Sequence, residues 1–174
     1  QRSDLKMTTD KIGLYVHIPL CVKKCNYCDF CSYPSASAEW RNNYIDTLIA
    51  EIDSYKGRGL SVDTLFFGGG TPSLLSPCEF DKICDHINSA FSLSPETEFT
   101  IEANPKTLSR QNLLAYKSCG VNRVSMGIQS VHENELKFLG RIHNREDAIE
   151  SYGLIRIAGI DNVNIDLMCG IPGQ

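Results

Sequence analysis

Four cysteines crowd into one short stretch of this chain. Cys21, Cys25, Cys28 and Cys31 lie within eleven residues, and the whole 174-residue sequence carries eight cysteines. A secreted disulfide scaffold spreads its cysteines along a short, loop-rich chain, whereas this chain is long enough to build its own core. Clustered thiols in a reducing compartment usually bind metal, so the stretch predicts a metal site. The four scattered cysteines are expected to pack as small apolar residues: Cys78, Cys84, Cys119 and Cys169.

The first three clustered cysteines have the spacing C-x3-C-x2-C. Three thiolates on one short loop can bind three irons of a cubane iron–sulfur cluster and leave the fourth iron open to an outside ligand. The alternatives are a structural zinc ion bound by Cys21, Cys25, Cys28 and Cys31, or a group of inert thiols.

A run of three glycines, Gly68 to Gly70, follows an apolar segment. Residues without a Cβ atom let backbone N–H and C=O groups approach a ligand closely. The run lacks the Lys-Ser/Thr pair of a Walker motif and does not fit G-x-G-x-x-G, which excludes both nucleotide-binding loops. We interpret it as a ligand-facing turn.

Other polar residues stand at or near the ends of later apolar segments: Glu102, Gln129, Arg141 and Asp166. Carboxylates at such positions can bind an ammonium group or ribose hydroxyls, and an arginine can bind a carboxylate through paired hydrogen bonds. A zwitterionic nucleoside needs that set of groups. Tyr15 is expected to present its ring edge at the same rim, and His17 to pack inside the sheet.

These residues depend on a set of strands and helices for their positions. Short β-branched or aromatic runs followed by turn residues predict five strands: Leu14–Ile18, Val62–Phe67, Glu98–Glu102, Arg123–Gln129 and Val163–Met168. The carboxyl ends of parallel strands share one rim of a sheet, where ligands bind. All the residues singled out above would meet there.

Segments with helical spacing alternate with the strands. The first two have the inward faces Trp40, Tyr44, Leu48, Ile52, Tyr55 and Phe80, Ile83, Ile87, Phe91. Ser109 begins a third helix with Leu113 and Leu114 inward, and a short fourth spans 132–139. Asn144 begins a fifth, with Ala148, Ile149, Tyr152 and Ile155 inward. Alternation of this kind predicts an α/β fold with parallel strands, either an open sheet or part of a barrel.

Composition narrows the class of protein. Hydrophobic residues make up 42%, charged residues 22%, and the formal net charge is −4, so nucleic acid is not the expected partner. No membrane span and no secretion signal is expected, which predicts a cytoplasmic location. We expect residues 1–13 to be an N-terminal extension and residues 14–174 to be one truncated core domain, because the chain starts with Gln and stops after the fifth strand.

Several sequence strings resemble one known family, the radical S-adenosylmethionine (radical SAM) proteins. CVKKCNYC at 21–28 matches the cluster motif. The closer resemblance is to the branch that contains oxygen-independent coproporphyrinogen III oxidase and the haem chaperone HemW. It is carried in order by YVHIPLC, CNYCDF, FFGGGTPSLLS, IEANP, GVNRVSMGIQS, LGRIHN and NIDLMCGIPGQ, from Leu14 to the last residue.

The resemblance implies a partial (β/α)6 barrel in which Cys21, Cys25 and Cys28 bind a [4Fe–4S] cluster. The free iron would take the amino and carboxylate groups of S-adenosylmethionine, and one electron would cleave the sulfonium to methionine and a 5′-deoxyadenosyl radical. The residues that stand where the family contacts this cofactor are Tyr15, Tyr27, Gly69, Gly70, Thr71, Glu102, Gln129, Arg141 and Asp166. In the oxidase some of them serve a second cofactor molecule.

Within the branch, the strings CDF, PSLLS and NIDLM look more like the chaperone. The oxidase has a further cysteine where this chain has Phe30, and Cys31 departs from both patterns. The resemblance therefore implies a haem chaperone that delivers haem to a partner protein. The alternative is oxidative decarboxylation of coproporphyrinogen III to protoporphyrinogen IX, and the outside alternative is a zinc-stabilised interaction module. A reductant protein such as flavodoxin or ferredoxin is a further expected partner.

Overall fold

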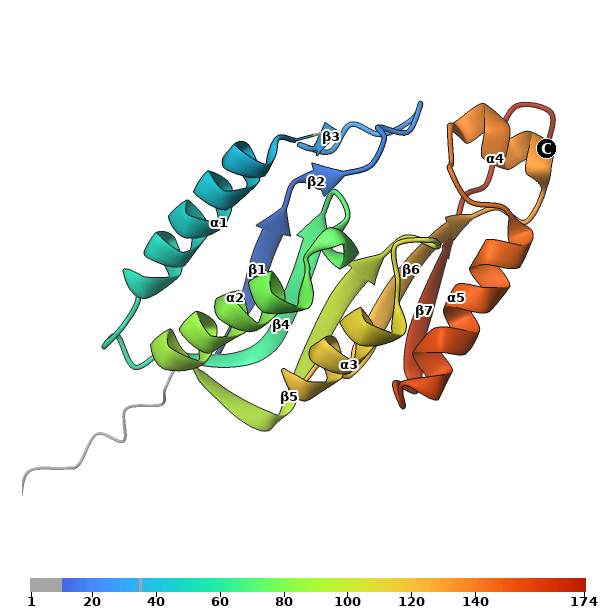
Figure 1. The fold of residues 1–174 in the computed structure, drawn as a ribbon. Coiled ribbons are helices and arrows are strands. Elements are labelled where there is room, and N and C mark those ends of the chain that lie inside the picture. The colour runs from blue at the N-terminus through green and yellow to red at the C-terminus, as the bar shows by residue number, and fades with distance from the viewer. Residues whose placement is uncertain (1–10, 35) are drawn as a thin grey trace, which may run out of the picture.

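The computed structural model describes residues 11–34 and 36–174. Its centre is a five-stranded sheet in which every pair of neighbouring strands is parallel. In spatial order the strands are β1 (Lys11–Ile18), β4 (Ser61–Gly69), β5 (Ser92–Ala103), β6 (Arg123–Gln129) and β7 (Asn162–Leu167). Sequence order and spatial order agree, so each crossover connects adjacent strands (Figure 1). The five expected strands are confirmed.

Two further strands are very short. β2 (Leu20–Cys21) and β3 (Tyr33–Pro34) form a separate parallel pair that closes the base of the cysteine-rich loop. The predicted N-terminal extension covers residues 1–13. Residues 1–10 lie outside the described part of the chain, and residues 11–13 form the beginning of β1.

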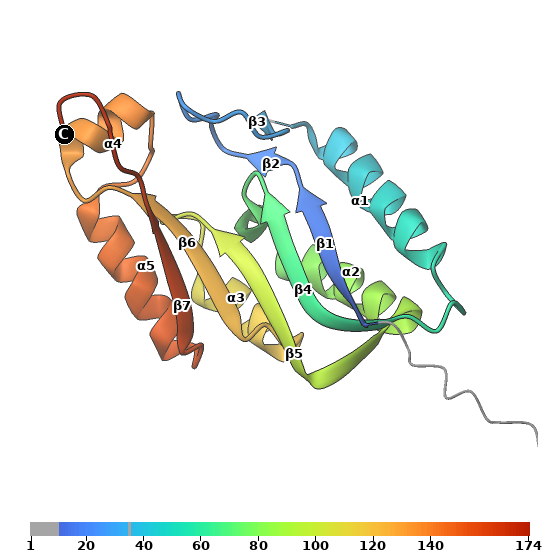
Figure 2. The same ribbon diagram turned by 180° about the vertical axis from the view of Figure 1, so that it is seen from behind.

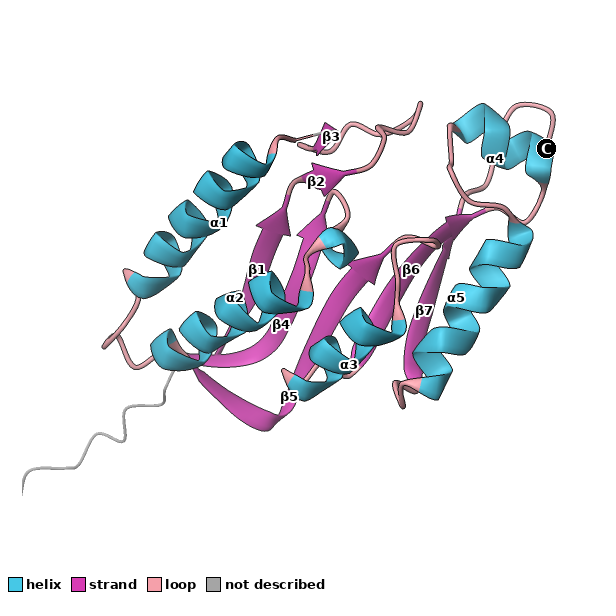
Figure 3. Ribbon diagram, viewed as in Figure 1, coloured by secondary structure: helices cyan, strands magenta, loops and turns pink. Residues whose placement is uncertain are grey.

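The longer helices cover one face of the sheet, and the other face is open (Figures 1 and 2). Figure 3 shows the alternation of strands and helices that the spacing predicted. The helical elements are α1 (Ala38–Asp53), the 3-10 turn η1 (Pro72–Leu74), α2 (Pro77–Ala90), α3 (Arg110–Ser118), α4 (Glu133–Leu139) and α5 (Arg145–Ile157).

Side-chain caps fix where several helices begin. Ser76 and Glu79 form a reciprocal capping box at α2, and Asn144 forms another with Asp147 at α5. Ser109 caps α3 because its hydroxyl oxygen accepts from the Asn112 backbone N–H at 3.1 Å. The two predicted caps, Ser109 and Asn144, are therefore confirmed.

The core lies between the sheet and the helices. Its centre is a group of aromatic rings whose centroids are 4.6 to 6.0 Å apart, formed by Phe67, Phe80, Phe99 and Tyr116. All four side chains are buried. Because these rings come from β4, α2, β5 and α3, burial of their apolar area holds the middle of the sheet against the helices.

Two helix faces differ from the predicted ones, and that of α1 largely agrees. In α1 Ile52 is buried as predicted, and Trp40, Leu48 and Tyr55 pack against the core beside the buried Ile45 and Ile49. In α3 Leu113 is buried, but Leu114 is 53% exposed and Tyr116 takes the inward position. In α5 the buried residues are Ala148, Ser151 and Ile155, whereas Ile149 and Tyr152 are exposed. A stripe of apolar residues wider than the contact surface leaves several faces possible, and packing selects one of them.

The scattered cysteines also divide into two groups. Cys84 is buried in the core and Cys119 packs against it, as expected. Cys78 and Cys169 are exposed, so the prediction that they are packing residues is wrong.

Candidate iron–sulfur and nucleoside site

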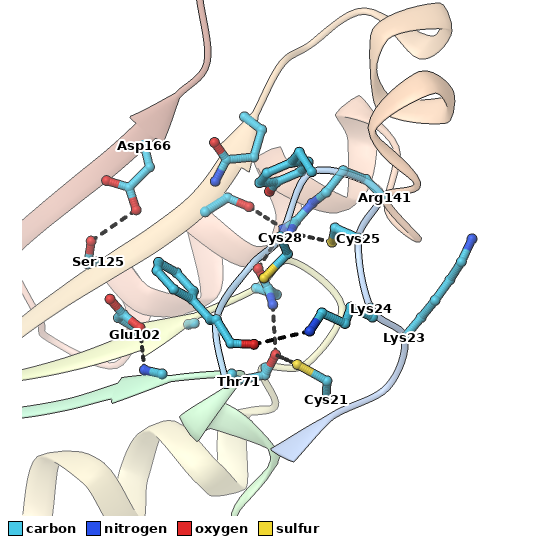
Figure 4. A pocket seen from close by; sticks show the side chains of 18 residues that line it. Cys21, Lys23, Lys24, Cys25, Cys28, Thr71, Glu102, Ser125, Arg141 and Asp166 are labelled. Carbon is cyan, nitrogen blue, oxygen red and sulfur yellow. Dashed lines mark hydrogen bonds between the residues drawn. The ribbon is translucent and has the colours of Figure 1, made fainter. Parts of the chain in front are cut away.

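The carboxyl ends of the strands surround a cavity of about 340 Å³ (Figure 4). All three predicted cluster cysteines line it, together with eight of the nine predicted cofactor residues. Those eight are Tyr27, Gly69, Gly70, Thr71, Glu102, Gln129, Arg141 and Asp166. Side chains and backbone groups from all five strand ends, or the loops after them, thus meet at one rim.

The cysteine-rich loop is fastened to α4, far along the chain. The Asn26 backbone N–H donates to the Leu139 carbonyl at 3.0 Å, and the Asn26 side-chain amide donates to the Phe138 carbonyl at 2.7 Å. Gly140 ends α4 with φ +73°, and a Cβ atom there would lie 2.9 Å from the Asn26 Oδ1. A glycine is therefore required where the loop meets the helix end.

Two thiols receive hydrogen-bonding groups from other segments. The Arg141 guanidinium donates to the Cys25 Sγ at 3.4 Å, and the Thr71 hydroxyl lies 3.7 Å from the Cys21 Sγ (Figure 4). Such donors stabilise thiolates, the form that binds iron.

The glycine run brings the end of β4 against the cysteine loop. A Cβ atom on Gly70 would lie 2.5 Å from the Leu20 carbonyl oxygen and 3.0 Å from the Cys21 Sγ. Gly69 has φ +116°, which side chains other than glycine rarely allow, and its Cβ would meet the His17 ring at 2.6 Å. The run is therefore a close approach of backbone to a thiol and an imidazole.

Two carboxylates stand across the cavity from the thiols. Glu102 accepts from the Gly69 N–H at 3.0 Å, and burial raises the pKa of its carboxyl, with the Gly69 hydrogen bond acting in the opposite direction. Asp166 accepts from the Ser125 hydroxyl at 3.3 Å and from the Asn164 amide at 2.7 Å. Both groups are able to accept from an ammonium group or a ribose hydroxyl.

Gln129 ends β6 in an unusual conformation. Its φ is +71°, a left-handed value for a residue that has a side chain, and the pairing of β6 with β7 shifts register between Gly127 and Gln129. Bulges of this kind re-aim side chains beside functional sites. Here Gln129 lines the cavity.

The two predicted tyrosines differ in position. Tyr27 lines the cavity, and burial raises the pKa of its hydroxyl while the Arg141 guanidinium acts to lower it. Tyr15 does not line the cavity and is 55% exposed. Its ring lies beside Gly68, where a Cβ atom would be 2.9 Å from the ring and 3.1 Å from the Glu102 carboxylate. Tyr15 thus borders Glu102 from below the rim.

His17 is not packed inside the sheet as predicted. Its Nε2–H donates to the Cys31 carbonyl at 2.8 Å, and its Nδ1 accepts from the Tyr15 hydroxyl at 3.3 Å. His17 alternates with the buried residues Val16 and Ile18, so it faces the open side of the sheet and holds the end of the cysteine loop.

Several cavity residues were not predicted from the sequence: Lys23, Lys24, Phe30, Ala103, Asn104, Ser125 and Gly127. Lys24 donates to the Phe30 carbonyl at 3.2 Å, and Lys23 points away from the thiols in Figure 4. The sequence pattern could have indicated two of these residues. Asn104 lies two residues after Glu102, and Ser125 lies two residues before Gly127, on the same face of β6.

A cluster and a single zinc ion require different arrangements of the three cysteine thiols. One zinc holds its thiolates about 2.3 Å from a shared metal, whereas a cubane binds each thiolate to a different iron and needs wider spacing. Within 11–34 and 36–174, no three His, Cys, Asp or Glu side chains are grouped closely enough to hold one metal ion. The free thiols of Cys21, Cys25 and Cys28 border one cavity instead.

Comparison with known proteins identifies the class of protein that has this fold and rim. Residues 15–174 match the radical SAM superfamily, and the chain belongs to that superfamily. Membership implies a [4Fe–4S] cluster and S-adenosylmethionine as cofactors, as the sequence resemblance predicted.

Individual relatives point to one branch of the superfamily. The chain is 43% identical over 174 residues to the "Heme chaperone HemW" of Buchnera aphidicola and 40% identical over 165 residues to that of Escherichia coli. These alignments cover 96% and 94% of this chain but only 45% and 44% of the relatives. The chain thus spans less than half the length of the curated relatives it matches.

A solved structure shares the fold. Coproporphyrinogen III oxidase (HemN) from Escherichia coli, described as a radical SAM enzyme, superimposes with a TM-score of 0.85 at 29% identity. The match covers 93% of this chain and 38% of that chain. The predicted α/β fold, a partial barrel of the radical SAM type, is confirmed. Among the residues that the structure describes, no helix is long and apolar enough to cross a membrane.

Proposed function

We propose that Cys21, Cys25 and Cys28 hold the [4Fe–4S] cluster at this rim and that the facing groups hold S-adenosylmethionine. The observation that carries this assignment is the single cavity bordered by the three thiols on one side and by Glu102 and Asp166 on the other. When bound, a reduced cluster of this type supplies the electron that cleaves the cofactor's sulfonium.

Each remaining residue contributes a contact suited to one part of a zwitterionic nucleoside. Glu102 offers an oxygen to an ammonium group, and Asp166 offers oxygens to ribose hydroxyls. Arg141 and Gln129 supply donors for a carboxylate, and the backbone of Gly69, Gly70 and Thr71 allows a close approach. Tyr27 covers the cluster side, and Tyr15 supports Glu102 from outside the cavity. Together they orient the cofactor and exclude water.

The biological role we propose is that of a haem chaperone, which binds haem and transfers it to a partner protein. This rests on the relatives named heme chaperone HemW, at 36 to 43% identity over nearly the whole chain. It also rests on Phe30, an exposed apolar side chain at the cavity, in the position where the resemblance gives the oxidase a further cysteine. A reductant protein and a haem-receiving protein are the proposed partners.

The cofactor part is tested by anaerobic reconstitution with iron and sulfide. About four irons per chain, acid-labile sulfide and saturable S-adenosylmethionine binding are expected. Zinc retained in place of iron would refute the assignment.

The chaperone part is tested on the full-length protein, by titrating haem anaerobically and following its transfer to a haem-free acceptor. A stable haem complex without change to the tetrapyrrole side chains is expected. Conversion of coproporphyrinogen III to protoporphyrinogen IX in the presence of a reductant would instead establish the oxidase.

The oxidase is the second candidate because of one observation. The structural likeness to coproporphyrinogen III oxidase extends over 93% of this chain with a TM-score of 0.85. The fold at this rim is thus compatible with either outcome, and the product analysis above separates them.

For both functions, we propose a reducing compartment such as the cytoplasm, because all eight cysteines are free.

A further inference from the structure

A continuous chain of polar contacts connects two of the three cluster cysteines. It runs from the Cys21 thiol to the Thr71 hydroxyl at 3.7 Å, and from there to the Asn104 amide nitrogen at 2.9 Å. It continues from the Asn104 carbonyl oxygen to the Arg141 guanidinium at 2.5 Å, and from Arg141 to the Cys25 thiol at 3.4 Å. Asn104 is the middle member of this chain.

The Asn104 amide determines which way both neighbours point. Its Nδ2 donates to the Thr71 oxygen, which leaves the Thr71 proton free to point at the Cys21 sulfur. Its Oδ1 accepts from Arg141, which directs another nitrogen of the same guanidinium at the Cys25 sulfur. A side chain at this position must donate one hydrogen bond to Thr71 and accept another from Arg141. The asparagine amide can do both, whereas an aspartate carboxylate can only accept.

Arg141 has few other partners that could replace Asn104. The same guanidinium nitrogen donates to the Gly127 carbonyl, and the buried Nε of Arg141 has no partner within the described part of the chain. Loss of the Asn104 oxygen would therefore leave a partly buried cation short of acceptors.

The backbone around Asn104 is held firmly. Its carbonyl accepts from the Thr107 N–H at 3.1 Å and from the Thr107 hydroxyl at 2.7 Å, and the Thr107 hydroxyl also lies 2.5 Å from that of Ser73. Lys106 completes the turn with φ +73°. The side chain is thus presented from a fixed turn at the end of β5.

We propose that Asn104 is a positioning residue for the cluster, which aims one hydrogen-bond donor at each of two ligand thiolates. Hydrogen bonds to cluster sulfurs favour the reduced, more negative state and raise the reduction potential, and outer partners of this kind strengthen metal retention. The inference rests on the proposed cluster ligands, and it adds a residue that is not itself one of those ligands.

The test compares reconstituted Asn104→Leu and Asn104→Asp with the unaltered full chain. In both variants we expect iron release to a chelator to be about 10-fold faster or more, and the cluster's reduction potential to be lower. The potential is measured by a redox titration followed by electron paramagnetic resonance. Asn104→Asp keeps the shape and the acceptor for Arg141, so it provides a foldable second variant if Asn104→Leu does not fold.

Asn122→Leu is the matched control. Asn122 also bridges two segments through its side chain, to the Phe99 N–H at 2.9 Å and the Thr97 carbonyl at 2.9 Å, but at the opposite end of the sheet. A merely structural loss would speed iron release equally in both positions and leave the potential unchanged, which would overturn the proposal. Thr71→Val should lower the potential too, and combining it with Asn104→Asp should add little.

Failure of the inference and failure of the proposed function are distinguishable. If the unaltered chain retains no iron, the cluster assignment falls and the inference falls with it. If the unaltered chain retains about four irons and the Asn104 variants match it in release rate and potential, only the inference is overturned.

Discussion

The two faces of the five-stranded sheet carry different kinds of side chain. Toward the helices, β1 and β4 present buried apolar residues such as Val16, Ile18 and Phe67. Toward the open side, visible in Figure 2, the alternate positions include polar groups such as His17 of β1 and Glu102 of β5. Since neighbouring residues of a strand point to opposite faces, one strand serves both purposes. The comparison indicates that stability comes mainly from the covered face and ligand chemistry from the open face and rim.

The largest expected effect is a loss of iron after substitution of a cysteine at the rim, whose side chain does not pack on the covered face of the sheet. Cys25→Ala should reduce the iron content of the reconstituted protein from about four atoms per chain to less than one, because a cubane with two protein ligands is poorly held. Iron analysis measures it, with Cys78→Ala, at an exposed thiol of α2, as the control. Full iron content in Cys25→Ala would show that the ligands are wrongly assigned.

The next effect tests the covered face. Phe80 is fully buried and its ring lies 4.6 Å from that of Tyr116. Phe80→Ala should lower the free energy of unfolding by about 3–5 kcal/mol, because it removes apolar contacts and leaves a cavity. Urea denaturation followed by circular dichroism measures the loss. Phe138→Ala, at a side chain 53% exposed, should change it far less. Equal losses would contradict the comparison of faces.

A buried histidine beneath the rim predicts a dependence of stability on pH. His143 donates from Nε2 to the Ile128 carbonyl, and burial, with the Arg141 charge, lowers its pKa from 6.5 to about 4. The unfolded chain binds a proton there more readily, so this contribution is complete above pH 6.5 and is lost as the pH falls toward 4.

The loss from His143 should reach up to about 3 kcal/mol. Urea denaturation of the cluster-free protein at pH 7 and pH 4.5 measures it. His143→Gln should flatten the dependence, whereas His132→Gln, at the start of α4, should leave it as in the unaltered chain. An unchanged dependence in His143→Gln would exclude this residue as its cause.

Glu102→Gln separates binding from stability on the open face. It should weaken S-adenosylmethionine binding by about 1–3 kcal/mol, because the site loses a charged acceptor. The free energy of unfolding should not fall, since burial disfavours the Glu102 carboxylate and the amide oxygen still accepts from Gly69. Calorimetric titration and urea denaturation measure the two quantities. Glu98→Gln, at an exposed position of the same strand, is the control.

The smallest expected effect is a gain in stability from a substitution on the outer surface of a helix. Gly153 lies within α5 with no atom within 4 Å of an added Cβ, so Gly153→Ala should stabilise the protein by about 0.5–1 kcal/mol. Gly70→Ala should have the opposite sign, because its Cβ would meet the Leu20 carbonyl at 2.5 Å. Thermal unfolding measures both. A gain in both variants would mean that the rim tolerates side chains there.

Much of this fold and site was predictable from local patterns. The strands, the caps at Ser109 and Asn144, and the three thiols with their facing glycines depend on neighbours in sequence, and the structure places the strands and caps as expected. The inward faces of α3 and α5 were partly wrong, because the docking angle against the sheet decides which apolar residues are buried. His17 was misplaced for a similar reason, since the strand pattern fixes alternation but not which face is covered.

The sequence by itself determined the order of strands and helices and the types of group delivered to the rim, since periodicity, capping and cysteine spacing are local properties. The tertiary structure alone decided which of those groups touch. Thr71 lies 33 residues before Asn104, and Arg141 lies 37 residues after it, yet the three residues form one series of contacts between two thiols. Contacts across parallel strands depend on register and twist, which no single segment encodes.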